Sequence, residues 1–179
     1  MHFYKVSEIL NRFDLLQLNS IANLILEVDA VYAFGNGGSM SIAVHFVQDL
    51  VKMGGIRAFA LDNISQLTAY SNDIGYQDVF SEQLKVLCSK DKVIMLFGIS
   101  FSGESLNVVN GVELSLKDSK VISVGLIGRE GSLLGKVVDY EICVGTGDVM
   151  VAEDVFSVIC HYLAGRVREM QEERKVKCQ

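Results

Sequence analysis

Continuous apolar runs that alternate with helical segments constrain this chain most. Long runs lie at residues 29–34, 92–98 and 120–126, and shorter ones lie at 56–60 and 140–144. An apolar run without polar alternation is typical of a strand that is covered on both faces, as in a parallel sheet. Helix-like segments separate the runs, so the sequence predicts an α/β fold with a parallel, doubly wound sheet of about five strands.

The segments between the runs carry apolar residues at helical spacing. We expect helices at 40–53, 79–87, 106–117 and 151–173, and a loop with a short helix at 62–75. The first 27 residues predict two helices, or one helix broken near Asp14. The chain therefore reads as one domain, with an N-terminal helical segment at 1–27 and an α/β core at 28–173.

Composition narrows the class of protein. The chain has 179 residues, which is ample for one core, and a net charge of −6. Basic residues cluster only at 166–177, where glutamates interrupt them, so we expect no nucleic-acid partner. No apolar run approaches the roughly 18 residues of a membrane span, and the N-terminus lacks a signal-peptide pattern. Four cysteines without CxxC spacing fit a reducing compartment, so we expect a cytoplasmic protein.

A glycine-rich turn follows the first apolar run. Gly35-Asn36-Gly37-Gly38-Ser39 ends the predicted strand and opens a predicted helix. Glycines let the backbone approach a ligand, and the helix start presents unpaired N–H groups that suit an anion, most often phosphate. Many strand-to-helix turns are glycine-rich for steric reasons alone, so this signal is weak by itself.

A second polar loop follows the run at 92–98. It carries Ser100, Ser102 and Ser105 and leads into another predicted helix. Hydroxyls and backbone amides together can surround a phosphate without a basic residue. The serines could instead cap the helix. Two such loops after two buried strands favour a phosphate site, because ligands of doubly wound sheets bind beyond the carboxyl ends of the strands.

Two histidine–carboxylate pairs lie on predicted helices. His45 precedes Asp49 by four residues, which places both on one helix face, and His161 follows Glu153 by eight. A histidine in an apolar stretch is more often a core residue, and a pair at this spacing is a common surface ion pair. Beside two phosphate-like loops, the pairs also suit a metal or acid–base site.

Several short segments occur in a specific order. They are 35–39, 43–46, 49–50, 67–69, 72–73, 75–76, 78–80, 100–105, 107–108, 153–155 and His161. With them the chain resembles the SIS (sugar isomerase) domain of sedoheptulose-7-phosphate isomerases, also called phosphoheptose isomerases. The resemblance runs over residues 30–165 and identifies 1–179 as a single SIS domain.

The resemblance implies a flavodoxin-like homotetramer with active sites between subunits and a role in lipopolysaccharide biosynthesis. Its activity would interconvert sedoheptulose 7-phosphate and D-glycero-D-manno-heptose 7-phosphate through an enediol. The implied substrate-binding residues are Asn36, Gly37, Gly38, Ser39, Asp73, Ser100, Ser102, Ser105 and Glu153. Asp49 would be the general base and His161 the general acid. In some members, residues matching His45, Asp49, Glu153 and His161 bind zinc.

The chain departs from the family pattern at five positions. Asp49 replaces a glutamate and Glu153 a glutamine, while Phe101, Glu104 and Met150 replace a threonine, an asparagine and an aspartate. The acidic side chain of Glu104 would repel a nearby phosphate unless it turns outward.

The spacing of the second pair bears on assembly. Along one helix, Glu153 and His161 would be about 12 Å apart. One metal ion would reach both only if Glu153 preceded the helix or if two subunits shared the site.

Two other functions stay open. One is a non-catalytic SIS protein that binds a sugar phosphate or a replication-initiation partner. The other is an isomerase of a different sugar phosphate.

Overall fold

Five parallel strands form the centre of the molecule. The computed structural model describes residues 1–88, 91, 93–113 and 120–177. The strands are β1 (Ala30–Gly35), β2 (Ala58–Ala60), β3 (Ile94–Ser100), β4 (Val121–Ile127) and β5 (Tyr140–Cys143). Their order is β2-β1-β3-β4-β5, and every pairing is parallel. The predicted five-stranded parallel sheet is confirmed.

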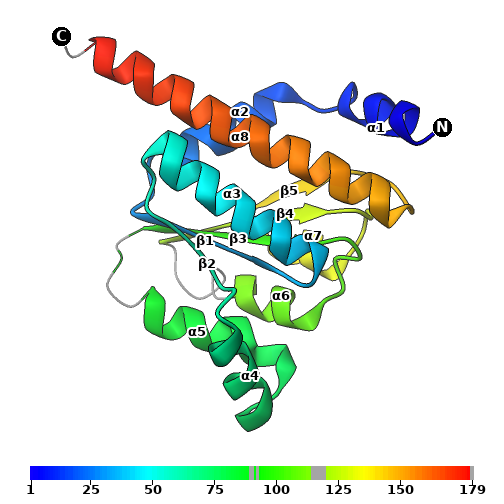
Figure 1. The fold of residues 1–179 in the computed structure, drawn as a ribbon, viewed down its shortest axis with the longest axis vertical. Helices are drawn as coiled ribbons and strands as arrows, with labels where there is room; N and C mark the ends of the chain where they lie inside the picture. The colour runs from blue at the N-terminus through cyan, green and yellow to red at the C-terminus, as the bar shows by residue number, and fades with distance from the viewer. Residues whose placement is uncertain (89–90, 92, 114–119, 178–179) are drawn as a thin grey trace.

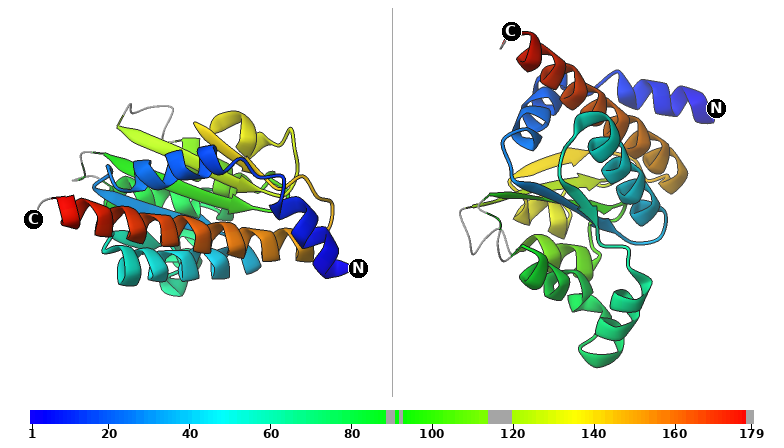
Figure 2. Two further views of the ribbon diagram at one scale, coloured as in Figure 1. Left: turned by 90° about the horizontal axis from the view of Figure 1, so that it is seen from above. Right: turned by 60° about the vertical axis from the view of Figure 1, so that its left-hand side comes forward.

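Helices cover both faces of the sheet (Figure 1). They are α1 (His2–Leu10), α2 (Leu15–Ile25), α3 (Gly38–Gly54), α4 (Ile64–Asp73), α5 (Val79–Leu87), α6 (Leu106–Val112), α7 (Leu133–Val137) and α8 (Val149–Lys177), with a 3₁₀ turn at Tyr76–Asp78. Helices α2, α3 and α8 lie on one face, and α5 and α6 lie on the other. Figure 2 shows α8 running beside α3 along much of its length.

The winding direction changes between β1 and β3. The chain passes from β1 outward to β2, and then crosses to β3 on the other side of β1. The backbone is therefore open between the carboxyl ends of β1 and β3, which is where doubly wound sheets bind ligands. Both loops singled out in the sequence leave the sheet at this point.

Each face of the sheet has its own apolar core. Under α2, α3 and α8, the ring of Phe46 packs against that of Phe97 at 4.9 Å between centroids. Under α5 and α6, the ring of Phe34 packs against that of Phe80 at 5.1 Å. Because β1 and β3 are buried along their whole length, both faces demand apolar residues, which explains their continuous apolar runs.

The N-terminal segment forms two helices. Asp14 ends the link between them, and its side chain accepts a hydrogen bond from the backbone N–H of Leu16, which caps α2. Helix α2 is buried on one side, whereas α1 buries none of its residues. Helix α1 lies near the start of α8, where His2 pairs with Asp154 at 2.6 Å.

Several predicted elements differ in extent. The segment expected to be mostly loop at 62–75 is largely helix α4, and helix α7 was not predicted. The helix predicted at 106–117 is described only as α6, and residues 114–117 lie outside the described residues. Helix α8 begins two residues earlier and ends later than predicted, so Glu153 lies on the same helix as His161.

Candidate active site

The first loop turns tightly between β1 and α3. Gly37 has a φ of +52°, a conformation that favours glycine. A side chain at Gly35 would meet the carbonyl oxygen of Ile99 at 2.7 Å, so only glycine lets β1 end so close to β3. Ser39, one residue into α3, is buried and faces this junction. The sequence thus builds a helix N-terminus directly at the switch point.

The second loop is held by its own serines. The Ser100 hydroxyl accepts a hydrogen bond from the Gly103 N–H at 3.1 Å and lies 3.2 Å from the Ser105 hydroxyl. The Ser102 hydroxyl accepts from the Glu104 N–H at 3.1 Å. Part of their hydrogen-bonding capacity therefore shapes the loop, as the capping alternative supposed. Each hydroxyl still has further capacity for a ligand.

A cavity of about 230 Å³ lies between the two loops. Its lining residues are Asn36, Ser39, Ile99, Ser100, Phe101, Ser102, Ser105, Val149 and Glu153. In the part of the chain that the structure describes, hydroxyl and amide groups dominate its polar lining, and no basic side chain lines it. We call this cavity the serine cradle. A second cavity of about 660 Å³ shares Asn36 and Ser105 with it and extends toward Tyr76.

An amide pair joins the two loops. Asn36 and Asn107 bond to each other reciprocally, at 2.9 and 2.8 Å. The Tyr76 hydroxyl donates to the Asn36 amide oxygen at 2.7 Å. Because Asn107 is buried, it fixes the orientation of Asn36 at the mouth of the serine cradle. Sequence reasoning gave Asn107 and Tyr76 no role, although both lie in segments that carry the resemblance.

Two residues of the second loop that depart from the family pattern, Glu104 and Phe101, contact residues outside the loop. The Glu104 carboxylate accepts a hydrogen bond from the Leu133 N–H at 3.1 Å, at the start of α7. Its side chain therefore turns outward, which is the condition under which an acidic residue in this loop does not repel a phosphate. The Phe101 ring lines the serine cradle and lies under the Arg129 guanidinium, 4.9 Å from the ring centroid.

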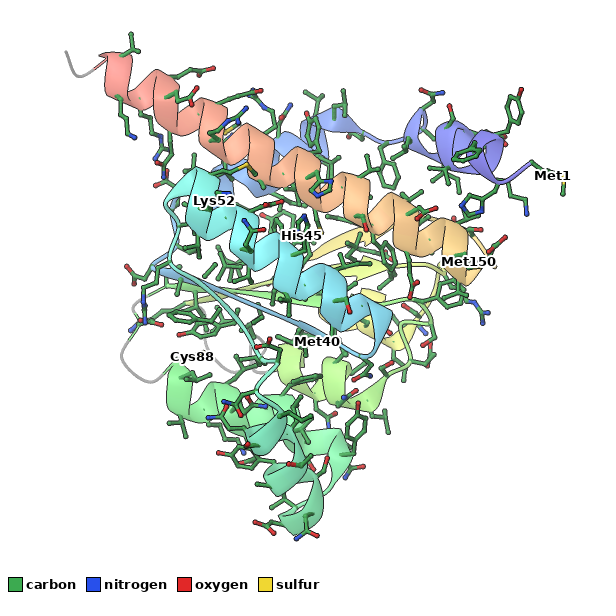
Figure 3. The ribbon with its side chains drawn as sticks, viewed as in Figure 1. Met1, Met40, His45, Lys52, Cys88 and Met150 are labelled. Carbon is green, nitrogen blue, oxygen red and sulfur yellow. The ribbon has the colours of Figure 1, made fainter. Side chains whose placement is uncertain are left out.

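Two histidines and one carboxylate meet between α3 and α8. The Nε2 atoms of His45 and His161 lie 3.0 Å apart, and each lies near Asp49 Oδ2, at 3.5 and 3.7 Å. Asp49 is buried, whereas both imidazoles are more than half exposed. Figure 3 shows His45 on the side of α3 that faces α8. We call these three residues the His–Asp cluster.

The His–Asp cluster has the geometry of a metal site. Its three ligand atoms lie within 4.8 Å of one another. Their separations are close to the roughly 3.4 Å expected between two ligand atoms that each lie ~2.1 Å from a tetrahedral ion. Two imidazoles and a carboxylate are also ligands that zinc accepts, with an exposed position left for a fourth.

The neighbouring thiol has no part in this chemistry. Cys160 is fully buried beside the cluster, and burial together with the nearby Asp49 charge raises its pKa far above the usual range of a thiol. The Cys160 side chain therefore stays protonated, whereas a metal ligand or nucleophile must be a thiolate.

Two predicted site residues lie apart from the places expected for them. Glu153 lines the serine cradle, two turns of α8 before His161, and does not join the His–Asp cluster. The reason is helical: both residues lie on α8, about 12 Å apart along its axis. Asp73 is exposed at the end of α4, bonds to Asn72 and lines neither of the two cavities.

Sequence comparison places these features in a known family. The SIS domain profile matches residues 14–125. The phosphoheptose isomerase of Geobacter metallireducens is 36% identical over 141 residues, covering 75% of this chain and 73% of the relative. That of Helicobacter pylori strain 26695 is 36% identical over 135 residues, covering 72% and 69%. The chain belongs to the phosphoheptose isomerase family of SIS domains.

Solved structures agree with the family in fold. The phosphoheptose isomerase of Neisseria gonorrhoeae superposes with a TM-score of 0.82 at 25% identity, covering 94% of this chain and 93% of that one. The Francisella tularensis phosphoheptose isomerase gives 0.83 at 22% identity, covering 93% and 92%. A Vibrio vulnificus protein complexed with ManNAc-6P shares the fold at 15% identity, with a TM-score of 0.71. These three proteins thus share the fold of this chain.

None of the helices in the described ranges is both long and apolar enough to cross a bilayer.

Proposed function

We propose that the protein is an aldose–ketose isomerase that interconverts sedoheptulose 7-phosphate and D-glycero-D-manno-heptose 7-phosphate. Membership of the phosphoheptose isomerase family supports this activity. One structural observation carries the proposal: α3 and α8 each contribute to the serine cradle near their starts and to the His–Asp cluster further along. Two shared helices therefore connect an anchor for phosphate to a set of proton-transfer groups.

The separation of anchor and cluster suits an open-chain sugar phosphate. From Ser39, His45 lies about 9 Å and Asp49 about 15 Å along the axis of α3. A chain of several carbons with a terminal phosphate spans the lower part of this range. With the phosphate held by the serines, the carbonyl end reaches toward the two imidazoles, which are open to solvent.

Proton transfer then converts ketose to aldose. Asp49 takes a proton from C1, and His161 gives a proton to the carbonyl oxygen at C2, which produces an enediol. Asp49 then delivers its proton to C2, while the O1 hydroxyl returns a proton to His161 and becomes the new carbonyl. Atoms balance, because one C–H and one O–H bond are broken and one of each is formed.

The family's metal chemistry fits this arrangement. Of the four residues expected to hold zinc, His45, Asp49 and His161 come together in one subunit. Each would hold the ion through the atom that faces the cluster, which leaves the second oxygen of Asp49 and Nδ1 of His161 for proton transfer. A zinc ion there would polarise the substrate carbonyl as a Lewis acid. Glu153 belongs to the serine cradle in this proposal.

An oligomer would complete the site. The two imidazoles are half exposed, and α1 presents Phe3 and Tyr4 almost fully to solvent. Exposed aromatic residues on one helix are typical of an interaction surface. We therefore propose a homotetramer in the cytoplasm, in which neighbouring subunits cover the His–Asp cluster.

Replacement of His161 tests the mechanism. His161→Ala should abolish turnover of sedoheptulose 7-phosphate, because the proton donor at oxygen is gone, and light scattering should give the same molar mass as for the wild type. Tyr162→Phe is the matched control, since the next residue on α8 binds Asn19 on the far side and touches no cluster atom. Wild-type turnover by the folded His161→Ala variant would refute the mechanism.

The rival is a sugar-phosphate-binding SIS protein without catalysis. It would bind sedoheptulose 7-phosphate and release it unchanged. The intact His–Asp cluster favours the enzyme, since pure binding needs only the serine cradle.

A further inference from the structure

Among the described residues that line the serine cradle, only Glu153 has a side chain that accepts hydrogen bonds without donating any. The other polar side chains that line it, four serines and Asn36, can all donate hydrogen bonds. A carboxylate cannot donate, and it repels the oxygens of an anion. Its presence in a phosphate site therefore needs a chemical reason.

The carboxylate of Glu153 lies at the start of α3. A Cβ placed on Gly38 would collide with it, so the glycine leaves the space that this carboxylate fills. Within the described residues, no hydrogen-bond donor or cation pairs with the Glu153 side chain, although it is only partly exposed. A half-buried carboxylate without a partner is costly, unless a ligand supplies the missing donor.

Within the described residues, no neighbouring charged side chain neutralises the Glu153 carboxylate. Glu104 is turned to α7, and Arg129 stacks on the Phe101 ring without lining the serine cradle. On its own helix, Asp154 pairs with His2. The cradle thus presents several donors and one negative charge to whatever enters.

We propose that Glu153 makes the serine cradle selective for a phosphate group that carries a proton. The P–OH group donates to the Glu153 carboxylate, while the serine hydroxyls and the α3 amides donate to the unprotonated oxygens. An anion without a proton meets repulsion at the same position, so a sugar phosphate, whose second pKa is about 6, enters the cradle as its singly protonated monoanion. This inference rests on the proposed role of the cradle as the phosphate site.

Phosphate and sulfate separate this effect from simple charge. At pH 7.5 both ions carry close to two negative charges, but only inorganic phosphate retains a proton. The wild-type protein should bind phosphate at least about tenfold more tightly than sulfate, because a hydrogen bond to a charged group is worth that much. Isothermal titration with each ion measures the two dissociation constants.

Substitution of Glu153 should remove the selectivity. Glu153→Gln keeps the shape and adds an amide donor, so sulfate affinity should rise until the two ions bind about equally. Glu153→Ala should also bring the ratio of the sulfate and phosphate dissociation constants near one. Because alanine adds no donor, this result would show that loss of the carboxylate, and not the new amide, removes the selectivity. Asp154→Asn is the matched control, because it removes the same charge one residue away and should keep the wild-type ratio.

The outcomes separate this inference from the proposed function. Equal binding of the two ions by the wild type, or an unchanged ratio in Glu153→Gln, would overturn the inference even if the protein turns over sedoheptulose 7-phosphate. A ratio that depends on Glu153 would uphold it even if no turnover occurs, in which case the proposed isomerase activity alone fails.

Discussion

Gly103 holds the second loop in a conformation that other residues adopt only with strain. Its φ is +67°, and its N–H binds the Ser100 hydroxyl. A Cβ at this position would also collide with the Ser132 side chain. The geometry of the serines thus depends on a residue that makes no side-chain contact itself.

Gly103→Ala should destabilise the protein by more than the about 1–2 kcal/mol that a left-handed backbone costs. The collision with Ser132 adds to that cost, and the Ser100 hydroxyl loses its place. Urea unfolding measures the loss. Gly131→Ala is the control, since Gly131 has a φ of +72° but no atom within 4 Å of an added Cβ. If both variants lose the same free energy of unfolding, the collision with Ser132 adds nothing and the prediction is wrong.

For single residues, the sequence predicted which side chains form the site better than it predicted which of them contact each other. The pairing of His45 with Asp49 follows from helical spacing, and the serines follow from their loop. That His161 meets this pair depends on how α8 packs on α3, which helical spacing along one segment cannot reveal. Glu153 was expected to bind substrate and also, in a site shared by two subunits, to hold metal; within one subunit it lines the cradle, two turns of α8 from His161.

Helices α3 and α8 are the elements that connect the two parts of the site. They lie side by side on one face of the sheet and both begin at its carboxyl edge. The start of α8 is fixed by Asp148, whose side chain accepts from the Val151 N–H at 3.4 Å and pairs with Lys5. The Val151 hydrogen bond, and then Lys5, hold the pKa of Asp148 below its usual range.

Asp148→Asn should lower the melting temperature at pH 7. The folded pKa of Asp148 is depressed, so its contribution is present above the unfolded value of about 3.9 and is lost as the pH falls through the folded pKa. The difference between wild type and variant should therefore shrink below about pH 4. Calorimetry across this range measures it. Lys5→Gln removes the lesser cause of the depressed pKa, so its melting temperature should differ less from that of the wild type. A difference between wild type and Asp148→Asn that persists at pH 2 would show that ionised Asp148 is not its source.

Elements with strong periodicity or full burial were predictable. Both faces of β1 and β3 are buried, and the continuous apolar runs record this. Helix α7 escaped prediction because it has five residues and depends on the Ser132 cap and on Glu104 from a distant loop. The C-terminal end of α8 was underestimated because its charged residues carry no apolar periodicity, which was the signal used to predict helices.

At the scale of the whole molecule, two parallel helices place the serine cradle and the His–Asp cluster at different points along their length. The sheet order opens a switch point, the loops at β1 and β3 form the serine cradle there, and α3 and α8 carry the His–Asp cluster away from it. The shorter Asp49 still lies within 4 Å of both imidazoles, so loss of one methylene leaves the cluster assembled. The fold class was predictable because topology follows from the alternation of elements. The homotetramer and the zinc ion follow only from the family resemblance and stay predictions, because both depend on what lies outside a single subunit.

Solvent-deuterium incorporation tests the central claim most directly. The purified protein, incubated with sedoheptulose 7-phosphate in D₂O and followed by NMR, should form the aldose with deuterium at C2 and exchange the C1 proton of the ketose. Asp49→Asn should lose both signals by a factor of about 10² or more, because the base at carbon is gone. A folded wild-type protein that binds the sugar phosphate yet leaves all its carbon-bound protons in place would contradict the account.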